Sequence, residues 1–425
     1  MKILLLCNYD PYNAGTVCDH IMSFPLYSRH DVYVFTHLVN NHGDLPEDVK
    51  LEAFDAIIVH YSIFLAVDAY VSERTRNKLR AYKGIKAAFL QDEYRFVNKS
   101  VDAISYIGFD LIFTCVPNES IELVYPKQKL PGVKIINVLT GYIPEYLSIF
   151  YPPVPLKKRR YDVSYRGRKY PIWHGRMGLE KWQIADNFIK NTKKQNLRLN
   201  ISYREEDRVY GTNWIKLLRN SIAVLGVESG ASIFDFSGEI SAKVETISAL
   251  IKKTDYKYYY TKSLRDVEDK INLAQISPRI FEAITLRTLC ILYEGDYSGI
   301  LTPWRHYIPL KKDFSNIQEV VSAIKDHDCV AEIIANAYSE IAINEKYSYK
   351  FFIKKVDSIL EEIAHIKSVG TQTWFNKSNK LDYVETLQII ATKYPVGQVH
   401  NYGNNMVNLL KRLTPNIVKQ VIKSI

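Results

Sequence analysis

The feature that most constrains this 425-residue chain is a regular alternation of short apolar runs with longer helical stretches. The runs are four to six residues long and rich in Ile, Val, Leu and Ala, and the first of them is Ile3 to Cys7. Strands of this length, buried on both faces and separated by helices, are typical of parallel sheets. The first 150 residues are therefore predicted to form one doubly wound α/β domain.

The segment from Tyr151 to Arg160 breaks this rhythm. It contains three prolines, which cannot continue a helix or a central strand, and ends in four consecutive cations, which we expect to stay in solvent. The α/β alternation then restarts at Tyr161. The sequence thus predicts a second Rossmann-like domain over residues 158–335, packing helices over 336–366 and a tail over 367–425.

Composition narrows the class of protein. Hydrophobic residues make up 47% of the chain and charged residues 24%, which is ordinary for a soluble globular protein. The five cysteines are scattered without CxxC spacing, and the ten histidines form no metal-ligand pair, so we expect reduced thiols, no metal and no cofactor. The apolar start is too short for a secretory core and no run could span a bilayer, which predicts a cytoplasmic protein.

The net charge of +10 points to an anionic partner. Phosphate-bearing small molecules and anionic lipids are candidates, whereas the absence of any nucleic-acid-binding motif predicts no nucleic-acid partner. The tail from Met406 to Ile425 carries four cations and no acid, with apolar residues at helical spacing. It is predicted either to lie on an anionic membrane surface or to dock on its own protein.

The segment around Ser277 is the best candidate for a phosphate site. Ser277 is a favoured N-cap and Pro278 suits the first helical position, so a helix is predicted to begin here. Helix N-termini attract pyrophosphate, Arg279 adds a permanent charge, and Glu282 lies one turn further on, where its carboxylate could accept hydrogen bonds from ribose hydroxyls. The alternative is a well-capped helix with Arg and Glu on its surface.

Three loops after predicted strands complete this candidate site, because ligands of open α/β sheets bind at the carboxyl ends of the strands. One loop begins at Glu228, and a second contains Ser298 and Gly299. The third, at residues 165–168, is rich in cations.

The segment 276–299 resembles the donor-binding region of GT-B nucleotide-sugar glycosyltransferases, particularly bacterial enzymes that assemble surface polysaccharides. The resemblance implies two Rossmann-like domains facing across a cleft, with donor ribose on Glu282. It further implies that Arg168 and Lys181 bind the donor diphosphate, with Arg176 as a competitor, and that the turn at residues 11–16, which contains Gly15, is the family's glycine-rich turn. Retaining relatives often carry a second Glu eight residues earlier, where this chain has Ala274.

Candidates for the acceptor side lie in loops after strands of the first domain. Asp92 and Glu93 directly follow an apolar run, and an inverting enzyme needs a carboxylate or His to take the acceptor's proton. His60 also follows a strand and could contact the sugar. For each residue the alternative is a structural or surface role.

These features together predict a metal-independent glycosyltransferase that moves a sugar from a nucleotide-diphosphate donor to a glycan or lipid-linked acceptor in surface-polysaccharide synthesis. The nucleotide sugar is a co-substrate, and the protein could be peripheral on the inner face of the membrane. A non-hydrolysing sugar-nucleotide epimerase is the alternative enzyme. A non-catalytic protein that binds nucleotide sugars or nucleic acid is the alternative from another class.

Overall fold

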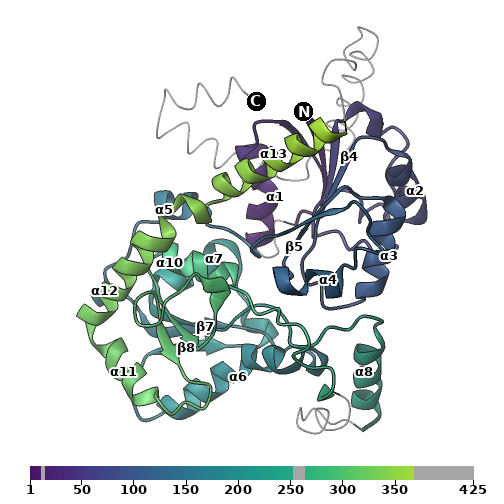
Figure 1. The fold of residues 1–425 in the computed structure, drawn as a ribbon. Helices are drawn as coiled ribbons and strands as arrows, with labels where there is room; N and C mark the ends of the chain where they lie inside the picture. The colour runs from purple at the N-terminus through teal and green to yellow at the C-terminus, as the bar shows by residue number, and fades with distance from the viewer. Residues whose placement is uncertain (11–14, 252–263, 368–425) are drawn as a thin grey trace, which may run out of the picture.

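The computed structural model describes residues 1–10, 15–251 and 264–367, and these residues form two parallel sheets covered by helices (Figure 1). The first sheet has six strands in the order β2-β1-β3-β4-β5-β6, all parallel. Its strands are β1 (Lys2–Leu6), β2 (Asp31–Phe35), β3 (Ala56–Val59), β4 (Ile85–Phe89), β5 (Leu111–Thr114) and β6 (Lys134–Asn137). β3, β4 and β5 are buried along their whole length, as their apolar runs predict, and in β4 this includes Lys86.

Helices connect these strands in the manner of a doubly wound fold. The α-helices are α1 (Gly15–Tyr27), α2 (Glu73–Ala81), α3 (Val97–Ile107), α4 (Ile121–Val124) and α5 (Tyr146–Phe150). Short 3₁₀ turns are η1 (Leu51–Ala53) and η2 (Asn118–Ser120).

The second sheet has five parallel strands in the order β11-β10-β9-β7-β8. These are β7 (Tyr161–Arg166), β8 (Leu199–Ser202), β9 (Ser221–Gly226), β10 (Leu289–Tyr293) and β11 (Ile308–Leu310). The helices associated with this sheet are α6 (Gly175–Thr192), α7 (Gly211–Arg219), α8 (Glu239–Ile251), α10 (Pro278–Thr285), α11 (Ile317–Lys325) and α12 (His327–Ala337). Shorter turns are η3 (Leu156–Lys158), η4 (Ile172–His174), η5 (Glu205–Asp207), η7 (Tyr297–Gly299), the π-helical η8 (Tyr338–Ala342) and η9 (Glu345–Tyr347).

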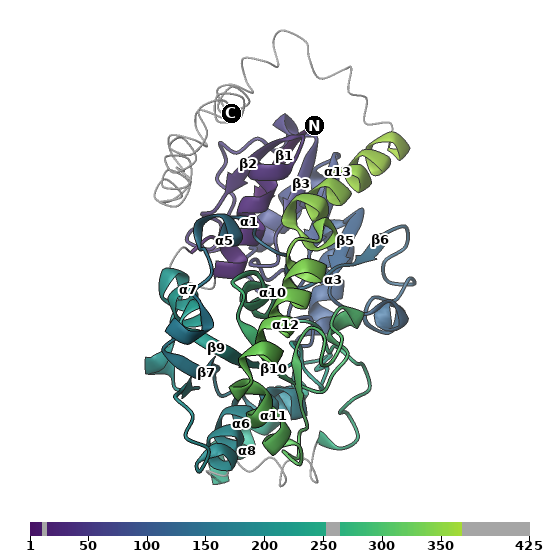
Figure 2. The same cartoon turned by 90° about the vertical axis from the view of Figure 1, so that its left-hand side faces the viewer.

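The last described helix, α13 (Tyr349–Ile366), returns to the first sheet and packs beside α1 (Figures 1 and 2). Phe352, Ile353 and Leu360 of α13 belong to the same buried cluster as Leu5 and Ile58 of the first sheet. The chain therefore passes between the two sheets twice, once in each direction.

The two passages lie next to each other. The Ile143 amide donates to the Tyr347 carbonyl at 2.8 Å, and the Tyr349 amide donates back to the Ile143 carbonyl at 3.4 Å. Nearby, the Thr140 hydroxyl donates to the Ile276 carbonyl at 2.7 Å, which ties the first passage to the segment just before α10.

The two domains also contact each other through segments that lie far in sequence from these two passages. The Asp235 amide donates to the Tyr94 carbonyl at 2.7 Å, and the Asn98 amide donates to the Phe236 carbonyl at 3.0 Å. Apolar side chains from both sides continue the contact, since Val97 of α3 and Val244 of α8 share one buried cluster.

The expectation that all four cations of residues 157–160 stay in solvent is wrong for Arg159, which is 3% exposed. Its guanidinium donates to the carbonyls of Val154 at 2.9 Å, Ser221 at 2.9 Å and Arg287 at 2.8 Å. Three backbone carbonyl oxygens, from the segment before β7, from the start of β9 and from the turn before β10, thus satisfy the buried charge.

No helix within the described residues is both long and apolar enough to cross a membrane. The predicted tail helix from Met406 to Ile425 lies outside the described residues, as do residues 11–14 of the predicted glycine-rich turn.

Candidate active site

A cavity of about 400 Å³ opens at the carboxyl ends of the strands of the second sheet. Asp92, in the loop after β4 of the first sheet, also lines it. Six residues singled out from the sequence line it, and they come from five separate segments of the chain. They are Asp92, Arg168, Lys181, Glu228, Ser277 and Arg279. A single cavity thus gathers residues that lie up to 187 positions apart in sequence (Asp92 to Arg279).

The start of α10 forms one wall of this cavity. Ser277 has the extended backbone of an N-cap and Pro278 occupies the first helical position, as predicted. The Ser277 side chain makes no capping hydrogen bond and lines the cavity instead. The positive end of the helix and a free hydroxyl are therefore both available to a ligand.

Three predicted cations line the same space, together with Arg166 and Arg208. Arg279 donates to the Arg166 carbonyl at 2.7 Å and lies 5.1 Å above the ring of Trp214. Lys181 donates to the Gly230 carbonyl at 2.8 Å, and burial lowers the pKa of its ammonium group. Arg168 is exposed and stacks 4.4 Å from the centre of the Tyr170 ring.

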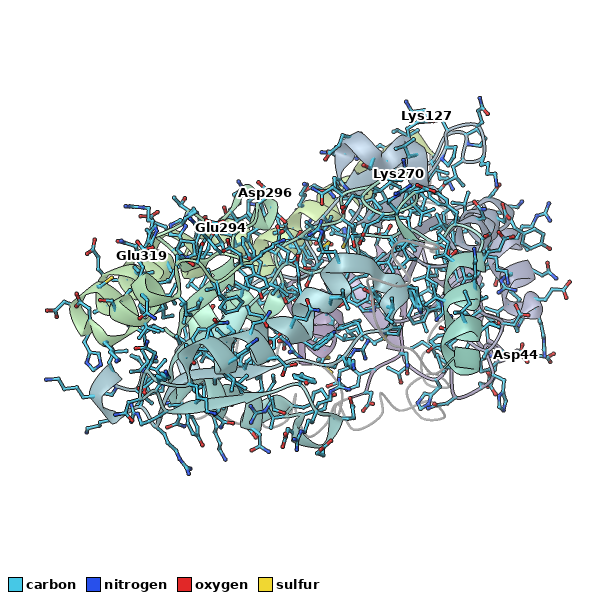
Figure 3. All side chains as sticks on the ribbon, turned by 90° about the horizontal axis from the view of Figure 1, so that it is seen from below. Asp44, Lys127, Lys270, Glu294, Asp296 and Glu319 are labelled. Atoms are coloured by element: carbon cyan, nitrogen blue, oxygen red, sulfur yellow. The ribbon has the colours of Figure 1, made fainter. Side chains whose placement is uncertain are left out.

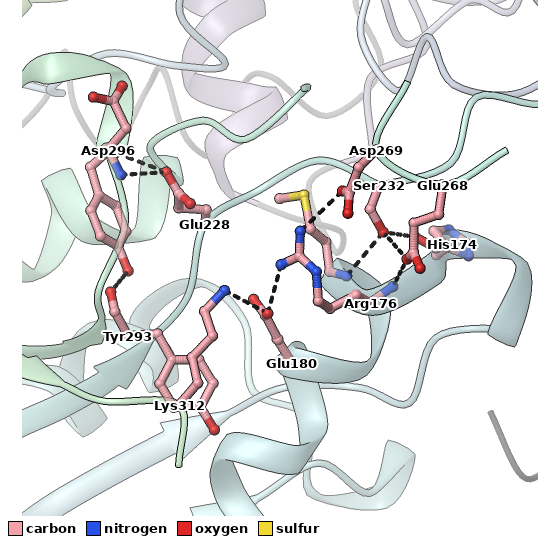
Figure 4. Close-up of polar contacts among 12 residues, drawn as sticks. His174, Arg176, Glu180, Glu228, Ser232, Glu268, Asp269, Tyr293, Asp296 and Lys312 are labelled. Carbon is pink, nitrogen blue, oxygen red and sulfur yellow. Dashed lines mark hydrogen bonds and ion pairs between the residues drawn. The ribbon is translucent and has the colours of Figure 1, made fainter. Parts of the chain in front are cut away.

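Arg176, the predicted competitor for the diphosphate, does not line this cavity. Its guanidinium pairs with Glu180 at 3.0 Å and with Asp269 at 3.0 Å (Figure 4). Lys312 contacts the same Glu180 carboxylate at 2.7 Å. Arg176 therefore fastens the start of α6 to residues 268–269.

Glu228 lies at the carboxyl end of β9 and lines the cavity. Its carboxylate accepts hydrogen bonds from the amides of Asp296 at 3.1 Å and Tyr297 at 2.8 Å (Figure 4). Burial raises its pKa, while these two amides act in the opposite direction. Glu228 thus positions the loop that follows β10.

The predicted residues Ser298 and Gly299 lie in that loop but do not line the cavity. The Ser298 hydroxyl accepts a hydrogen bond from the Ile276 amide at 3.1 Å. The loop therefore supports the residue that precedes Ser277.

Glu282 lies beside the main cavity, where its carboxylate accepts a hydrogen bond from the indole of Trp214 at 2.7 Å. It lines a smaller space of about 40 Å³ with Arg279 and, from the first domain, Gly15 and Thr16. Burial raises the pKa of Glu282, opposed by the Trp214 hydrogen bond and by the charge of Arg279. Burial, together with the charge of Glu282, also raises the pKa of Asp19 on α1.

The three acceptor-side candidates have different surroundings. Asp92 is exposed, has a left-handed backbone (φ 57°) and lines the large cavity. Glu93 is buried, and its carboxylate accepts hydrogen bonds from the Cys115 amide at 2.7 Å and from the hydroxyls of Thr114 and Tyr125.

His60 is fully buried and lines none of these spaces. Its ring nitrogens contact the Ser62 hydroxyl at 2.9 Å and His20 at 3.0 Å, and burial lowers its pKa well below the usual range. The structure thus brings Asp92 to the donor-side residues and places His60 in the core of the first domain.

A second cavity of about 180 Å³ adjoins Asp92 on the side of the first sheet. It lies at the carboxyl ends of β3 and β4, between residues 61–67 and 89–97, with Tyr125 on a further side. Asp92 lines both this cavity and the large one, so it is a residue that the two spaces share.

Sequence reasoning missed Trp214, Tyr170 and Arg208, all of which line the large cavity. Trp214 lies on α7, whose helical spacing of apolar residues gave no sign that one of them would face a ligand. Tyr170 could have been found, because it lies two residues after Arg168 in the cation-rich loop.

Among residues 1–10, 15–251 and 264–367, no group of three or more His, Cys, Asp or Glu side chains could hold a metal ion.

No protein-family model matches the chain. Among curated proteins, protein O-glucosyltransferase 1 of Bos taurus is 48% identical over 249 residues, covering 51% of this chain and 58% of the bovine protein. Protein O-glucosyltransferase 2 of Danio rerio is 24% identical over 180 residues, covering 42% of this chain and 31% of that protein. The chain therefore matches little more than half the length of the bovine relative and less of the other.

Among solved structures, an alpha-glucosyltransferase in complex with UDP and a 13-mer DNA containing an HMU base matches with a TM-score of 0.53 at 12% identity. The match covers 85% of this chain and 99% of that chain. At this identity the likeness concerns the fold alone, and it confirms the expected GT-B architecture of two Rossmann-like domains facing across a cleft.

Proposed function

We propose that this chain is a glycosyltransferase that transfers a sugar from a nucleotide-diphosphate donor to an acceptor hydroxyl. The observation that carries the proposal is the large cavity, where Arg168, Lys181 and Arg279 from the second domain face Asp92 from the first. Cations and a helix N-terminus suit a diphosphate, and a carboxylate on the opposite wall suits a reacting hydroxyl.

In the proposed reaction, the nucleotide diphosphate lies against Ser277 and the three cations, and its ribose reaches Glu282. Asp92 takes the proton of the acceptor hydroxyl as that oxygen bonds to the anomeric carbon. The bond between this carbon and the diphosphate oxygen breaks, and the nucleotide diphosphate leaves with the bonding electrons. The cations stabilise the negative charge that develops on it, in place of a metal ion.

UDP-glucose is the donor that we propose. Two curated relatives are named O-glucosyltransferases, and the alpha-glucosyltransferase of similar fold was solved with UDP. For the acceptor we propose a glycan or lipid-linked hydroxyl in surface-polysaccharide synthesis, which rests on the resemblance of residues 276–299. We propose that the protein acts in the cytoplasm, and its net charge of +10 supports a place near an anionic membrane face.

Calorimetric titration with UDP tests the site. Glu282→Gln and Arg279→Ala should each raise the dissociation constant for UDP by roughly 10- to 100-fold, because each removes a charge-assisted hydrogen bond worth about 1.5–3 kcal/mol. Glu319→Gln is the matched control, since Glu319 is exposed on α11 and lies on the periphery of the molecule (Figure 3). Unchanged UDP affinity in both site variants would show that the site is wrongly assigned.

Incubation with UDP-glucose alone separates the proposed activity from an epimerase. A sugar-nucleotide epimerase would change the donor's sugar without an acceptor, whereas a glycosyltransferase releases UDP only by transfer or slow hydrolysis. Chromatography of the nucleotide sugars distinguishes the two results, and an altered sugar still attached to UDP would contradict the proposal.

A further inference from the structure

The cavity of about 180 Å³ next to Asp92 has mostly apolar walls. Tyr61, Phe64, Val67, Leu90 and Phe96 line it. Phe64 is 44% exposed and Val67 is 38% exposed, so large apolar side chains of this wall are left open to solvent. A bound apolar group would remove this surface from water.

Polar side chains are the minority of this lining, and the two charged ones besides Asp92, namely Glu93 and Arg95, are engaged with other residues. The Glu93 carboxylate already accepts from Cys115, Thr114 and Tyr125. Arg95 lies 4.8 Å over the ring of Phe96 and 3.8 Å from Glu245.

Most of the wall therefore offers no partner to the hydroxyls of an unsubstituted sugar ring, and burying hydroxyls unpaired is costly. The Gln91 side-chain oxygen is buried and accepts no hydrogen bond within the described part of the chain. It offers one polar contact beside Asp92.

The size of the cavity limits what can enter it. An apolar cavity of roughly 150 Å³ is enough to hold a benzene ring. A volume of about 180 Å³ thus suits a group of one aromatic ring or one prenyl unit.

We propose that this cavity binds an apolar, ring-sized group of the acceptor, which holds the neighbouring hydroxyl at Asp92. The inference rests on the proposed function and narrows its acceptor to molecules whose reacting hydroxyl lies close to an aryl or prenyl group. Asp92 lines both cavities. An acceptor whose apolar group occupies the smaller cavity would therefore have its neighbouring hydroxyl beside Asp92, next to the large cavity.

Ligand-observed NMR titration of the full chain in the presence of UDP tests the inference. The probes are phenyl, prenyl and methyl β-glucopyranoside, which share one polar part and differ only in the apolar group. The phenyl or the prenyl glucoside should bind at least tenfold more tightly than the methyl glucoside, and the tighter of the two identifies the source of the apolar group. Equal affinity for all three probes would overturn the inference.

Variants of residues that line the cavity test whether the apolar group of the probes binds there. Val67→Trp should fill the cavity and reduce the preference for the apolar probes to less than threefold, and Phe64→Ala, which removes one wall, should weaken it as well. Leu123→Ala is the control, because Leu123 is 60% exposed on α4 and does not line the cavity. An undiminished preference in both cavity variants would show that the apolar group binds elsewhere.

The same samples are assayed for transfer from UDP-glucose. Absent UDP binding and absent transfer would contradict the proposed function, whereas UDP binding with no preference among the glucosides would contradict this inference alone.

Discussion

Asp92 and Glu93 are adjacent in sequence but have opposite surroundings. The left-handed backbone at Asp92 (φ 57°) turns the chain so that one carboxylate faces the cavities and the next enters the core. Such a backbone is strained for a non-glycine residue and is often found at functional sites. It is consistent with the proposed role of Asp92 as the base.

Burial raises the pKa of Glu93 to about 7 from an ordinary value of 4.5. Between these two pH values the folded chain holds a proton that the unfolded chain has lost, so the free energy of unfolding falls as pH rises. We expect this group to cost about 3 kcal/mol of stability by pH 8 relative to pH 4. Urea denaturation between pH 4 and pH 8 should show that the free energy of unfolding falls more steeply with pH for the natural chain than for Glu93→Gln.

Glu119→Gln is the control for this measurement, because Glu119 is exposed in η2. Its stability profile should run parallel to that of the natural chain. Parallel profiles for Glu93→Gln as well would show that Glu93 titrates normally.

The cations of the large cavity lead to a second prediction at the scale of single residues. If Arg168, Lys181 and Arg279 neutralise the leaving diphosphate, transfer from UDP-glucose should persist at full rate in excess EDTA. Lys181→Ala should lower kcat by roughly 10²- to 10³-fold with or without the chelator. A loss of activity in EDTA that Mg²⁺ restores would show that a metal performs this role.

At the scale of elements, Arg159 fixes how β7 enters the second sheet. Its guanidinium joins the segment before β7 to the starts of β9 and β10 through three carbonyl groups. Arg159→Met leaves these carbonyls without a donor and should lower the free energy of unfolding by about 2–4 kcal/mol.

Arg160→Met is the matched control, since Arg160 is exposed and its guanidinium only lies over the ring of Tyr161 at 5.3 Å. In chemical denaturation, the free energies of unfolding of the two variants should differ by more than about 1 kcal/mol. Equal stability would mean that water replaces the Arg159 contacts without cost.

At the scale of the whole molecule, α13 completes the first domain with residues from the far end of the described chain. Phe352 is 2% exposed and stacks on Tyr142 with 4.3 Å between ring centres. Arg29 pairs with Glu361 at 2.6 Å and Lys134 with Glu362 at 2.6 Å, which fastens the helix across the sheet.

Phe352→Ala should therefore lower the free energy of unfolding by about 3–5 kcal/mol, the usual cost of a cavity left by a buried aromatic ring. The adjacent Phe351 is 39% exposed, and Phe351→Ala should cost less than about 1 kcal/mol. Urea denaturation of both variants checks the difference. Similar losses would show that α13 does not contribute to the core of the first domain.

The sequence by itself determined the architecture, because short apolar runs that alternate regularly with helical stretches favour parallel strands covered by helices. It also determined the start of α10, since Ser277 and Pro278 are local signals that do not depend on distant contacts.

Only the tertiary structure decided which polar residues meet. It placed Trp214 against Glu282, set Asp92 in the cleft and buried His60 and Glu93, because these outcomes depend on the packing of segments far apart in the chain. It also buried Arg159, whose carbonyl partners lie up to 128 residues away. A periodic pattern shows which face of an element is apolar, but it does not show which surface that face will meet.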